Sequence, residues 1–543
     1  RRSRDERAVG MLVLAAQASA FLLSGTRPLI HAARTCIGIR ADASLPTLTE
    51  LTDPREWLEN VEGEDALDWV RSRNEDALKA IGEPSSKPSY SRVLSILDSN
   101  DKIPYIGRVL NGLYYNFWQD EEQPRGIWRR CTLGEYRKPE PAWELVLDLD
   151  ALGAADGTKW VWGGTALLDE GPDVRKERVM IRLSRGGSDA TVAREFDLDT
   201  KQFISPEEGG FELPEAKSRF SYKDRDTLLV GGVFGEAEMT DSGYPRTVRE
   251  WKRGTPVAEA PLVFEGAAAD VSVGGSAYLD RGCRYEMRVR SLTFYTSSHE
   301  IAVDGGAFAP VEVPADANVG TFSDQLVISL RSAWLGHEAG SLLAAPLARF
   351  MAAEDEAARG ALLTPLFTPT ESCSLEGTEE TRNYLILSAL DNVVSELRFW
   401  RYDPAAGGGE GGGGGGWSLE RSLKDEGYRV VSASGVNPDE TDDIWITTDG
   451  FTQPPTLSLA TATAPTAREP LKSLPAFYEA AGLQTQQLFA TSADGTQVPY
   501  FLVSREDAPL DGSTPTLLYG YGGFEVSLTP GYSAEVGAAW LEK

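Results

Sequence analysis

Near the end of the chain stands Leu517-Leu518-Tyr519-Gly520-Tyr521-Gly522-Gly523-Phe524, an apolar run that leads directly into a glycine-rich turn. We expect residues 515–519 to form a compact strand in which Tyr519 is buried, because short apolar runs bounded by turn residues are typical of buried strands. Sheets of α/β proteins present site residues in this way, at the turns that follow the carboxyl ends of strands. Just upstream, residues 489–492 and 498–503 flank a turn-forming segment and predict a β-hairpin. The end of the chain therefore predicts the start of an α/β domain.

The long middle of the chain repeats a strand pattern. Trp143, Leu145 and Leu147 alternate with Glu144, Val146 and Asp148, and similar short runs occupy 178–184, 285–289, 324–331, 384–390 and 442–448. Turn-forming clusters such as 185–189 and 304–306 separate these runs. The alanine-rich stretch 342–363 is the one candidate for a long helix. Many short strands over such a length favour a β-propeller over a single sandwich, but no repeat motif reveals the number of blades.

Helical signals are concentrated at the amino end. Between residues 65 and 81 the apolar side chains of Leu67, Val70, Leu78 and Ile81 fall on one face, which predicts an amphipathic helix. Before it, Asp53 is placed to cap a short helix that begins at the following proline. Residues before about 43 are set aside from the fold. They contain an acid-free, arginine-containing segment at 11–40 that resembles an organellar transit peptide or a disordered leader.

Both ends of the chain resemble the prolyl oligopeptidase family of serine peptidases. At the carboxyl end the resemblance rests on the glycine-rich motif with its flanks at 492–499 and 528–533, and at the amino end on residues 53–59. It implies an α/β-hydrolase domain interrupted by a β-propeller, with seven blades. We accordingly expect a leader at 1–44, the first part of the hydrolase domain at 45–110, the propeller at 111–471, and the start of the catalytic domain at 472–543.

The same resemblance assigns two site residues. Tyr521 is the expected oxyanion donor, because a fixed hydroxyl aimed at the developing negative charge of an acyl-transfer transition state lowers the barrier. Phe524 resembles the aromatic residue that lines the substrate cleft. The serine, aspartate and histidine of the triad are expected downstream of Lys543, since no G-x-S-x-G elbow occurs and the segments around Ser188 and Ser533 both fail its last position.

Composition argues against several other functions. Asp and Glu number 82 against 53 Lys and Arg, a formal net charge of −29 that repels a phosphate backbone, so nucleic acid is not an expected partner. The four cysteines form no C-x-x-C pair and the three histidines no H-E-x-x-H motif, so we expect neither a metal nor another cofactor. The apolar stretch 12–23 is too short to cross a membrane. The glycine tracts at 407–409 and 411–416 are not a phosphate loop and predict a flexible insertion between two strands.

These observations leave three functions open. The first is a serine peptidase that cleaves short peptides after proline, acts as a monomer, and is cytoplasmic, or organellar if the leader is a transit peptide. The second is a sister peptidase on the same scaffold that cleaves after basic residues. The third is a non-catalytic propeller that binds protein partners. We expect the 543-residue chain by itself to be inactive, because without a nucleophile and a base no acyl-enzyme forms.

Overall fold

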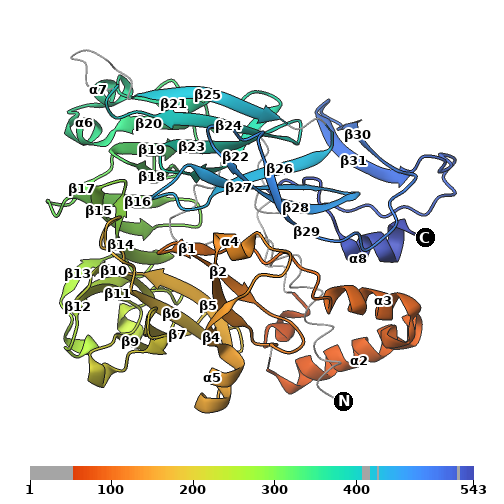
Figure 1. Cartoon of the computed structure of the whole chain (residues 1–543), viewed down its shortest axis with the longest axis horizontal. Coiled ribbons are helices and arrows are strands. Elements are labelled where there is room, and N and C mark those ends of the chain that lie inside the picture. The colour runs from red at the N-terminus through yellow and green to blue at the C-terminus, as the bar shows by residue number, and fades with distance from the viewer. Residues whose placement is uncertain (1–52, 61, 407–415, 425–426, 522–525) are drawn as a thin grey trace.

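The computed structural model describes residues 53–543 with the exception of 61, 407–415, 425–426 and 522–525. Within these residues seven antiparallel sheets of four or five strands follow one another along the chain, and each contains only strands that are consecutive in sequence. Figure 1 shows the sheets arranged in a ring, with the helices α2 (Glu64–Ile81) and α3 (Pro88–Leu97) and the hairpin β30–β31 on one side of it. This is a seven-bladed β-propeller, and the number of blades implied by the resemblance is confirmed.

The first four blades comprise, in order, β1 (Arg108–Leu110), β2 (Leu113–Trp118), β3 (Ile127–Thr132) and β4 (Glu144–Asp148); β5 (Trp160–Leu167), β6 (Arg178–Arg185), β7 (Thr191–Asp197), β8 (Gln202–Phe203) and β9 (Glu212–Ala216); β10 (Arg219–Asp224), β11 (Thr227–Gly231), β12 (Thr247–Lys252) and β13 (Leu262–Glu265); and β14 (Ser272–Asp280), β15 (Cys283–Ser291), β16 (Ser297–Val303) and β17 (Ala309–Pro310). Short helices α4 (Leu133–Tyr136) and α5 (Leu149–Asp156) flank β4.

The remaining three blades comprise β18 (Asn318–Phe322), β19 (Gln325–Ser329), β20 (Leu342–Pro346) and β21 (Thr364–Phe367); β22 (Cys373–Glu380), β23 (Tyr384–Asp391), β24 (Val394–Tyr402) and β25 (Trp417–Lys424); and β26 (Arg429–Gly435), β27 (Asp443–Gly450), β28 (Gln453–Thr461) and β29 (Glu469–Ser473). The glycine insertion lies outside the described residues, but the strands on either side of it, β24 and β25, pair antiparallel. The predicted strand runs are thus confirmed.

The core lies in layers between neighbouring blades, because each antiparallel blade turns an apolar face toward both neighbours. The closing layer joins blade 7 to blade 1, where the ring of Trp445 packs edge-on against Tyr114 and Tyr136 at centroid distances of 6.1 and 5.8 Å. Nearby, Arg137 and Glu469 form an ion pair at 2.9 Å. Among the described residues no strand is shared between these two blades, so side chains alone close the ring.

Segments from the two ends of the chain form a small second body beside the propeller. Ile96 of α3 is buried with Tyr478, Ala534 and Ala538, the last two from α8 (Ala534–Val536) and the π-helical turn Gly537–Leu541. The guanidinium of Arg92 donates to the carbonyl of Phe477, and the rings of Tyr478 and Tyr532 stack at 5.1 Å. The propeller is therefore inserted between two parts of one packed unit.

Three local predictions need correction. Residues 515–519 form no strand, and Leu518 and Tyr519 are 93% and 68% exposed, since no described strand lies beside them to accept their hydrogen bonds. The stretch 342–363 is β20 followed by the short helices α6 (Leu347–Ala352) and α7 (Glu356–Gly360), because its first residues pair with β19 as a strand. Asp53 accepts a hydrogen bond from the amide of Arg55 at 2.8 Å in a turn before the 3₁₀ segment Glu56–Glu59, and does not cap a helix that begins at Pro54.

Two other predicted elements are present, although the first strand of the hairpin begins six residues earlier than predicted, at Leu483. The hairpin consists of β30 (Leu483–Thr491) and β31 (Gln497–Arg505), with Thr491 opposite Gln497. The helix predicted at 65–81 is α2, but its apolar face is not covered: Ala66 is its one buried residue among those described, and Ile81 is 64% exposed. No helix in the described part of the chain has the length and apolar character needed to cross a bilayer.

Candidate functional site

Tyr521 lies at the end of an extended segment that follows β31. Its side chain is 51% exposed, and its hydroxyl has no hydrogen-bond partner among the described residues. A tyrosine hydroxyl that a ligand can reach is able to donate to it, as an oxyanion donor must. Phe524 lies outside the described residues. The oxyanion role of Tyr521 and the cleft role of Phe524 stay predictions.

Three elements on the same side of the propeller in Figure 1 carry exposed apolar side chains: α2, the hairpin β30–β31 and the segment before Tyr521. The exposed large side chains are Val70, Leu78, Ile81, Phe489, Val498, Tyr500, Leu517, Leu518 and Tyr519. On the hairpin they occur on both faces, because Phe489 pairs with Pro499 whereas Val498 pairs with Ala490. Exposed apolar side chains in such number mark places where further protein packs.

The serines and histidines of the described chain form no catalytic arrangement. Ser533 accepts a hydrogen bond from the amide of Val536 at 3.2 Å and so caps α8, while Ser188 donates to the carbonyl of Ala190 at 3.2 Å within the turn between β6 and β7. His299 lies on β16 in blade 4, and burial lowers its pKa, so its imidazole is neutral near pH 7. Ser533 also donates to the carboxylate of Glu535 at 3.1 Å, but no hydrogen bond joins a serine to a histidine among the described residues, as a nucleophile and its base require.

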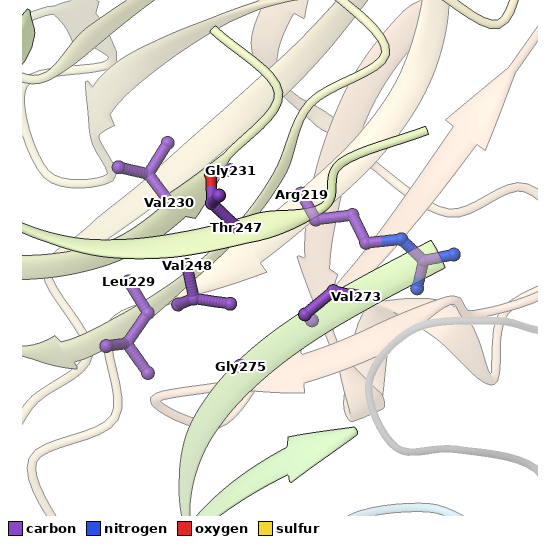
Figure 2. A pocket seen from close by; sticks show the side chains of 9 residues that line it. Arg219, Leu229, Val230, Gly231, Thr247, Val248, Val273 and Gly275 are labelled. Atoms are coloured by element: carbon purple, nitrogen blue, oxygen red, sulfur yellow. The ribbon is translucent and has the colours of Figure 1, made fainter. Parts of the chain in front are cut away.

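The two pockets outlined by the structure lie in the propeller and do not include Tyr521. Figure 2 shows the first, a recess between blades 3 and 4 that encloses about 150 Å³ and leaves no room for a water molecule. Its walls are mainly aliphatic, with Leu229, Val248 and Val273 on the inside and Arg219 at the rim. The second is an open depression beside α5. No group of three His, Cys, Asp or Glu side chains in the described residues is arranged to hold a metal ion.

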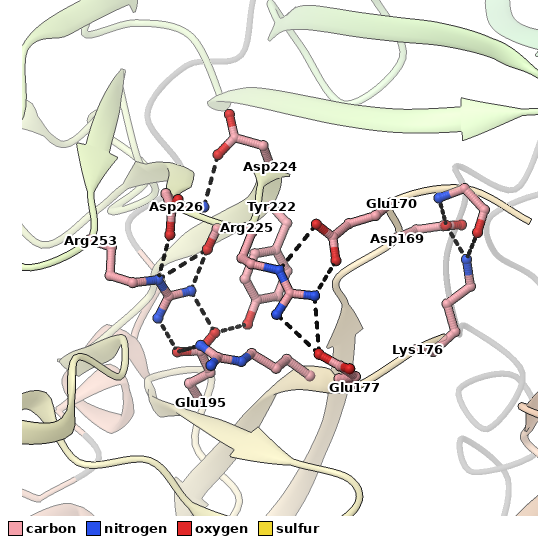
Figure 3. Close-up of polar contacts among 12 residues, drawn as sticks. Asp169, Glu170, Lys176, Glu177, Glu195, Tyr222, Asp224, Arg225, Asp226 and Arg253 are labelled. Atoms are coloured by element: carbon pink, nitrogen blue, oxygen red, sulfur yellow. Dashed lines mark hydrogen bonds and ion pairs between the residues drawn. The ribbon is translucent and has the colours of Figure 1, made fainter. Parts of the chain in front are cut away.

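A polar network joins blades 2 and 3. The carboxylate of Glu195 on β7 is fully buried and accepts hydrogen bonds from Arg253 at 2.6 and 2.9 Å, from the hydroxyl of Tyr222 at 2.8 Å and from the amide of Phe211 at 3.1 Å. Figure 3 shows this cluster beside a second one, in which Arg225 of blade 3 binds Glu170 and Glu177 of blade 2. Sequence reasoning missed both clusters, because neither the pairing nor the burial of these residues leaves a local signal.

Comparison with known proteins agrees with this architecture. Residues 45–285 match the family model described as prolyl oligopeptidase, N-terminal beta-propeller domain. The chain is 36% identical over 509 residues to an uncharacterized peptidase of Sinorhizobium fredii, covering 91% of this chain and 66% of the relative. It is 34% identical over 516 residues to the prolyl endopeptidase of Elizabethkingia meningoseptica, covering 91% and 64%.

A solved structure is similar as well. It is described as a post-proline cleaving enzyme from Rickettsia typhi, and it superimposes with a TM-score of 0.77 at 28% identity, over 90% of this chain and 70% of that one. The chain thus spans about two thirds of the length of the curated relatives that it matches.

Proposed function

Because this chain belongs to the prolyl oligopeptidase family, we propose that the protein from which it comes is a serine peptidase that cleaves short peptides after proline. The preference for proline is supported by the names of two similar proteins, a prolyl endopeptidase and a post-proline cleaving enzyme. Peptides are accordingly the proposed substrates.

The observation that carries this proposal is the second body beside the propeller. It is built from α3 at one end of the chain and from residues 477–483 and 532–541 at the other, and exposed apolar side chains stand on α2, on the hairpin and at residues 517–519. A domain assembled from both ends, with an uncovered apolar side, is what an interrupted hydrolase domain looks like when part of its sheet is absent. The relatives extend beyond the matched region, and the triad is proposed to lie in the corresponding part of this protein.

In the complete site this chain contributes the residue that stabilises the oxyanion and a residue that lines the substrate cleft. As the serine attacks the scissile carbonyl, negative charge develops on the carbonyl oxygen, and the Tyr521 hydroxyl donates to it alongside a backbone amide. Phe524 lines the cleft near the scissile bond. Since the donor bond strengthens mainly in the transition state, it acts on kcat more than on substrate affinity.

The test begins with the coding sequence beyond Lys543. The extended protein is assayed with three chromogenic peptides that carry proline, arginine or alanine before the scissile bond, and with a fluorophosphonate probe that labels activated serines. We expect cleavage of the proline peptide and labelling by the probe, with the 543-residue chain silent in both assays. Preference for the arginine peptide would replace the proposed specificity. A stop codon directly after Lys543 would favour the non-catalytic propeller.

A further inference from the structure

A pair of aromatic rings is exposed at the tip of blade 4. Phe294 and Tyr295 lie in the turn between β15 and β16 and are 71% and 48% exposed. Their rings pack edge to face at a centroid distance of 4.9 Å, so they form one apolar patch. Turn residues are commonly small or polar, and two adjoining exposed rings are therefore unusual at such a place.

The turn holds the two rings in a fixed arrangement. The hydroxyl of Thr293 accepts hydrogen bonds from the amides of Tyr295 and Thr296, at 3.2 and 3.1 Å. It also lies 2.7 Å from the hydroxyl of Thr296, and the amide of Leu292 closes the turn by donating to the carbonyl of Thr296 at 2.8 Å. A surface that is already ordered loses less entropy when a partner covers it.

A cation from the next blade borders the patch. Arg331 follows β19 in blade 5, and its guanidinium lies 4.4 Å from the centroid of the Tyr295 ring. A guanidinium over the face of an aromatic ring is attracted by the electrons of that ring. Phe, Tyr and Arg are the residue types enriched in protein–protein contacts, so the composition of the patch is that of an interface.

The tip of blade 4 lies on the face of the propeller that bears the second body. The turn between the second and third strands stands at this face in every blade, because the blades are antiparallel sheets with their strands joined in the same order. In blade 7 this turn contains Phe451, whose ring packs against Phe501 of β31 at 5.6 Å and whose carbonyl accepts a hydrogen bond from Tyr478. In blade 6 it contains Asn392, whose carbonyl accepts from Gln487 of β30.

The patch belongs to one tip and not to the whole face. The corresponding turns of blades 2, 3 and 5 are residues 186–190, 232–246 and 330–341, all within the part of the chain that the structure describes. Large exposed apolar side chains occur in none of these three turns, and in blade 4 they are Phe294 and Tyr295. Such a localised pair favours one specific contact over general stickiness of the surface.

We propose that Phe294, Tyr295 and Arg331, which we call the aromatic tip, form a docking site for the part of the hydrolase domain that follows Lys543. The inference rests on the proposed function, in which the domain begun by the second body continues beyond this chain. The chain covers 66% and 64% of two relatives, so about a third of each lies outside the match. A segment of that size, packed against the exposed side chains of β30–β31, extends over the neighbouring tips of the same face.

Docking at blade 4 gives the completed domain a second support. The chain passes between the propeller and the second body next to β1 and β29, which belong to blades 1 and 7. A contact at blade 4 lies well away from these two connections around the ring, so it limits how far the domain can tilt from the propeller. The two rings receive an apolar side chain, and the guanidinium beside them favours a carbonyl or carboxylate oxygen at its edge.

The test compares the exposure of the aromatic tip in the 543-residue chain and in the extended protein. Phe294→Cys variants of both are treated with iodoacetamide, and labelling at position 294 is followed by mass spectrometry. We expect labelling at least about tenfold slower in the extended protein, because burial of the remaining Tyr295 ring favours docking by that factor or more. Val303→Cys is the matched control: Val303 is 39% exposed at the other end of β16, on the opposite face, and should be labelled equally fast in both.

A second measurement removes the two rings themselves. In the extended protein, Phe294→Ser combined with Tyr295→Ser should increase the radius of gyration measured by small-angle X-ray scattering, whereas Val303→Ser should not. In the 543-residue chain the double variant should melt with the parent, because both rings are exposed there. An increase in the extended protein is then due to undocking and not to misfolding of the propeller.

The outcomes separate the docking site from the peptidase activity. Equal labelling of position 294 in both lengths overturns the docking site and leaves the peptidase proposal standing. A protected tip in an extended protein that cleaves no peptide supports the docking site and overturns the peptidase proposal. Labelling of the 543-residue chain that slows at higher protein concentration, or on addition of a proline peptide, would show that a second copy or the substrate covers the tip, and overturns the proposed occupant.

Discussion

Replacing Arg253 with methionine should destabilise the junction of blades 2 and 3 far more than an ordinary ion-pair mutation. Its guanidinium makes two hydrogen bonds, at 2.6 and 2.9 Å, to the fully buried carboxylate of Glu195. Breaking a buried pair by removing one partner costs about 3–5 kcal/mol, because the other charge stays buried. Tyr222 and Phe211 continue to donate to Glu195, and Arg178 lies 3.7 Å from it, so we expect the lower end, about 3 kcal/mol.

Of the remaining donors to Glu195, the hydroxyl of Tyr222 keeps its proton at any pH of interest. Burial, followed by the charge of Glu195, raises the pKa of Tyr222 well above its usual value, so the hydroxyl stays protonated and donates throughout the accessible pH range. It offsets part of the lost interaction but supplies no positive charge. The carboxylate of Glu195 therefore remains undercompensated in Arg253→Met.

The assay is guanidinium chloride unfolding followed by tryptophan fluorescence, with Arg225→Met as the matched control. Arg225 joins the same two blades, but its side chain and those of Glu170 and Glu177 are each about a third exposed, so its loss should cost about 1 kcal/mol or less. Adding Glu195→Gln to Arg253→Met should recover much of the stability, because it removes the buried charge. If Arg253→Met costs no more than Arg225→Met, the reasoning from burial is wrong.

Three further predictions address other parts of the chain. In the extended enzyme, Tyr521→Phe should lower kcat by about 10²–10³ with little change in KM, and a kcat within about threefold of the parent would show that the motif is only a turn. Burial, and then Glu380, raise the pKa of Glu379 to about 7, above its unfolded value, so its destabilising effect is absent at low pH and grows as pH rises from about 4.5 to 7; Glu379→Gln should melt with the parent at pH 5 and at a higher temperature at pH 8. Deleting residues 411–416 should barely change the melting temperature, because halving a flexible loop alters closure entropy by only about 0.6 kcal/mol, and a large drop would show that the segment is packed.

Sequence reasoning succeeded where the signal is local. Alternation with a period of two needs only adjacent residues, so the strands around Leu145 and Leu387 were identifiable without knowledge of their partners. The hairpin β30–β31 was equally readable, because its turn residues lie between its two strands. The motif around Tyr521 pointed to the family for the same reason, since its glycines and its tyrosine are contiguous.

Sequence reasoning failed where an element depends on a distant neighbour. Residues 515–519 have the composition of a buried strand, yet no described strand lies beside them, and their side chains stay exposed. The apolar face of α2 was correctly located but is uncovered for a similar reason. The composition of a segment indicates which side chains it is able to bury. Whether they are buried depends on a second helix or strand that packs against them.

The sequence by itself determined that this protein is rich in short strands, that helical segments stand at its start, and that its glycine-rich motif resembles that of a peptidase family. The tertiary structure decided that the strands form seven blades, and that α3 meets residues 477–483 and 532–541 in one packed body. It also decided that Arg253 of blade 3 is paired with the buried Glu195 of blade 2. Nothing in the neighbourhood of either residue along the chain predicts this pair, because a buried charge is satisfied by atoms that folding brings near it from another blade.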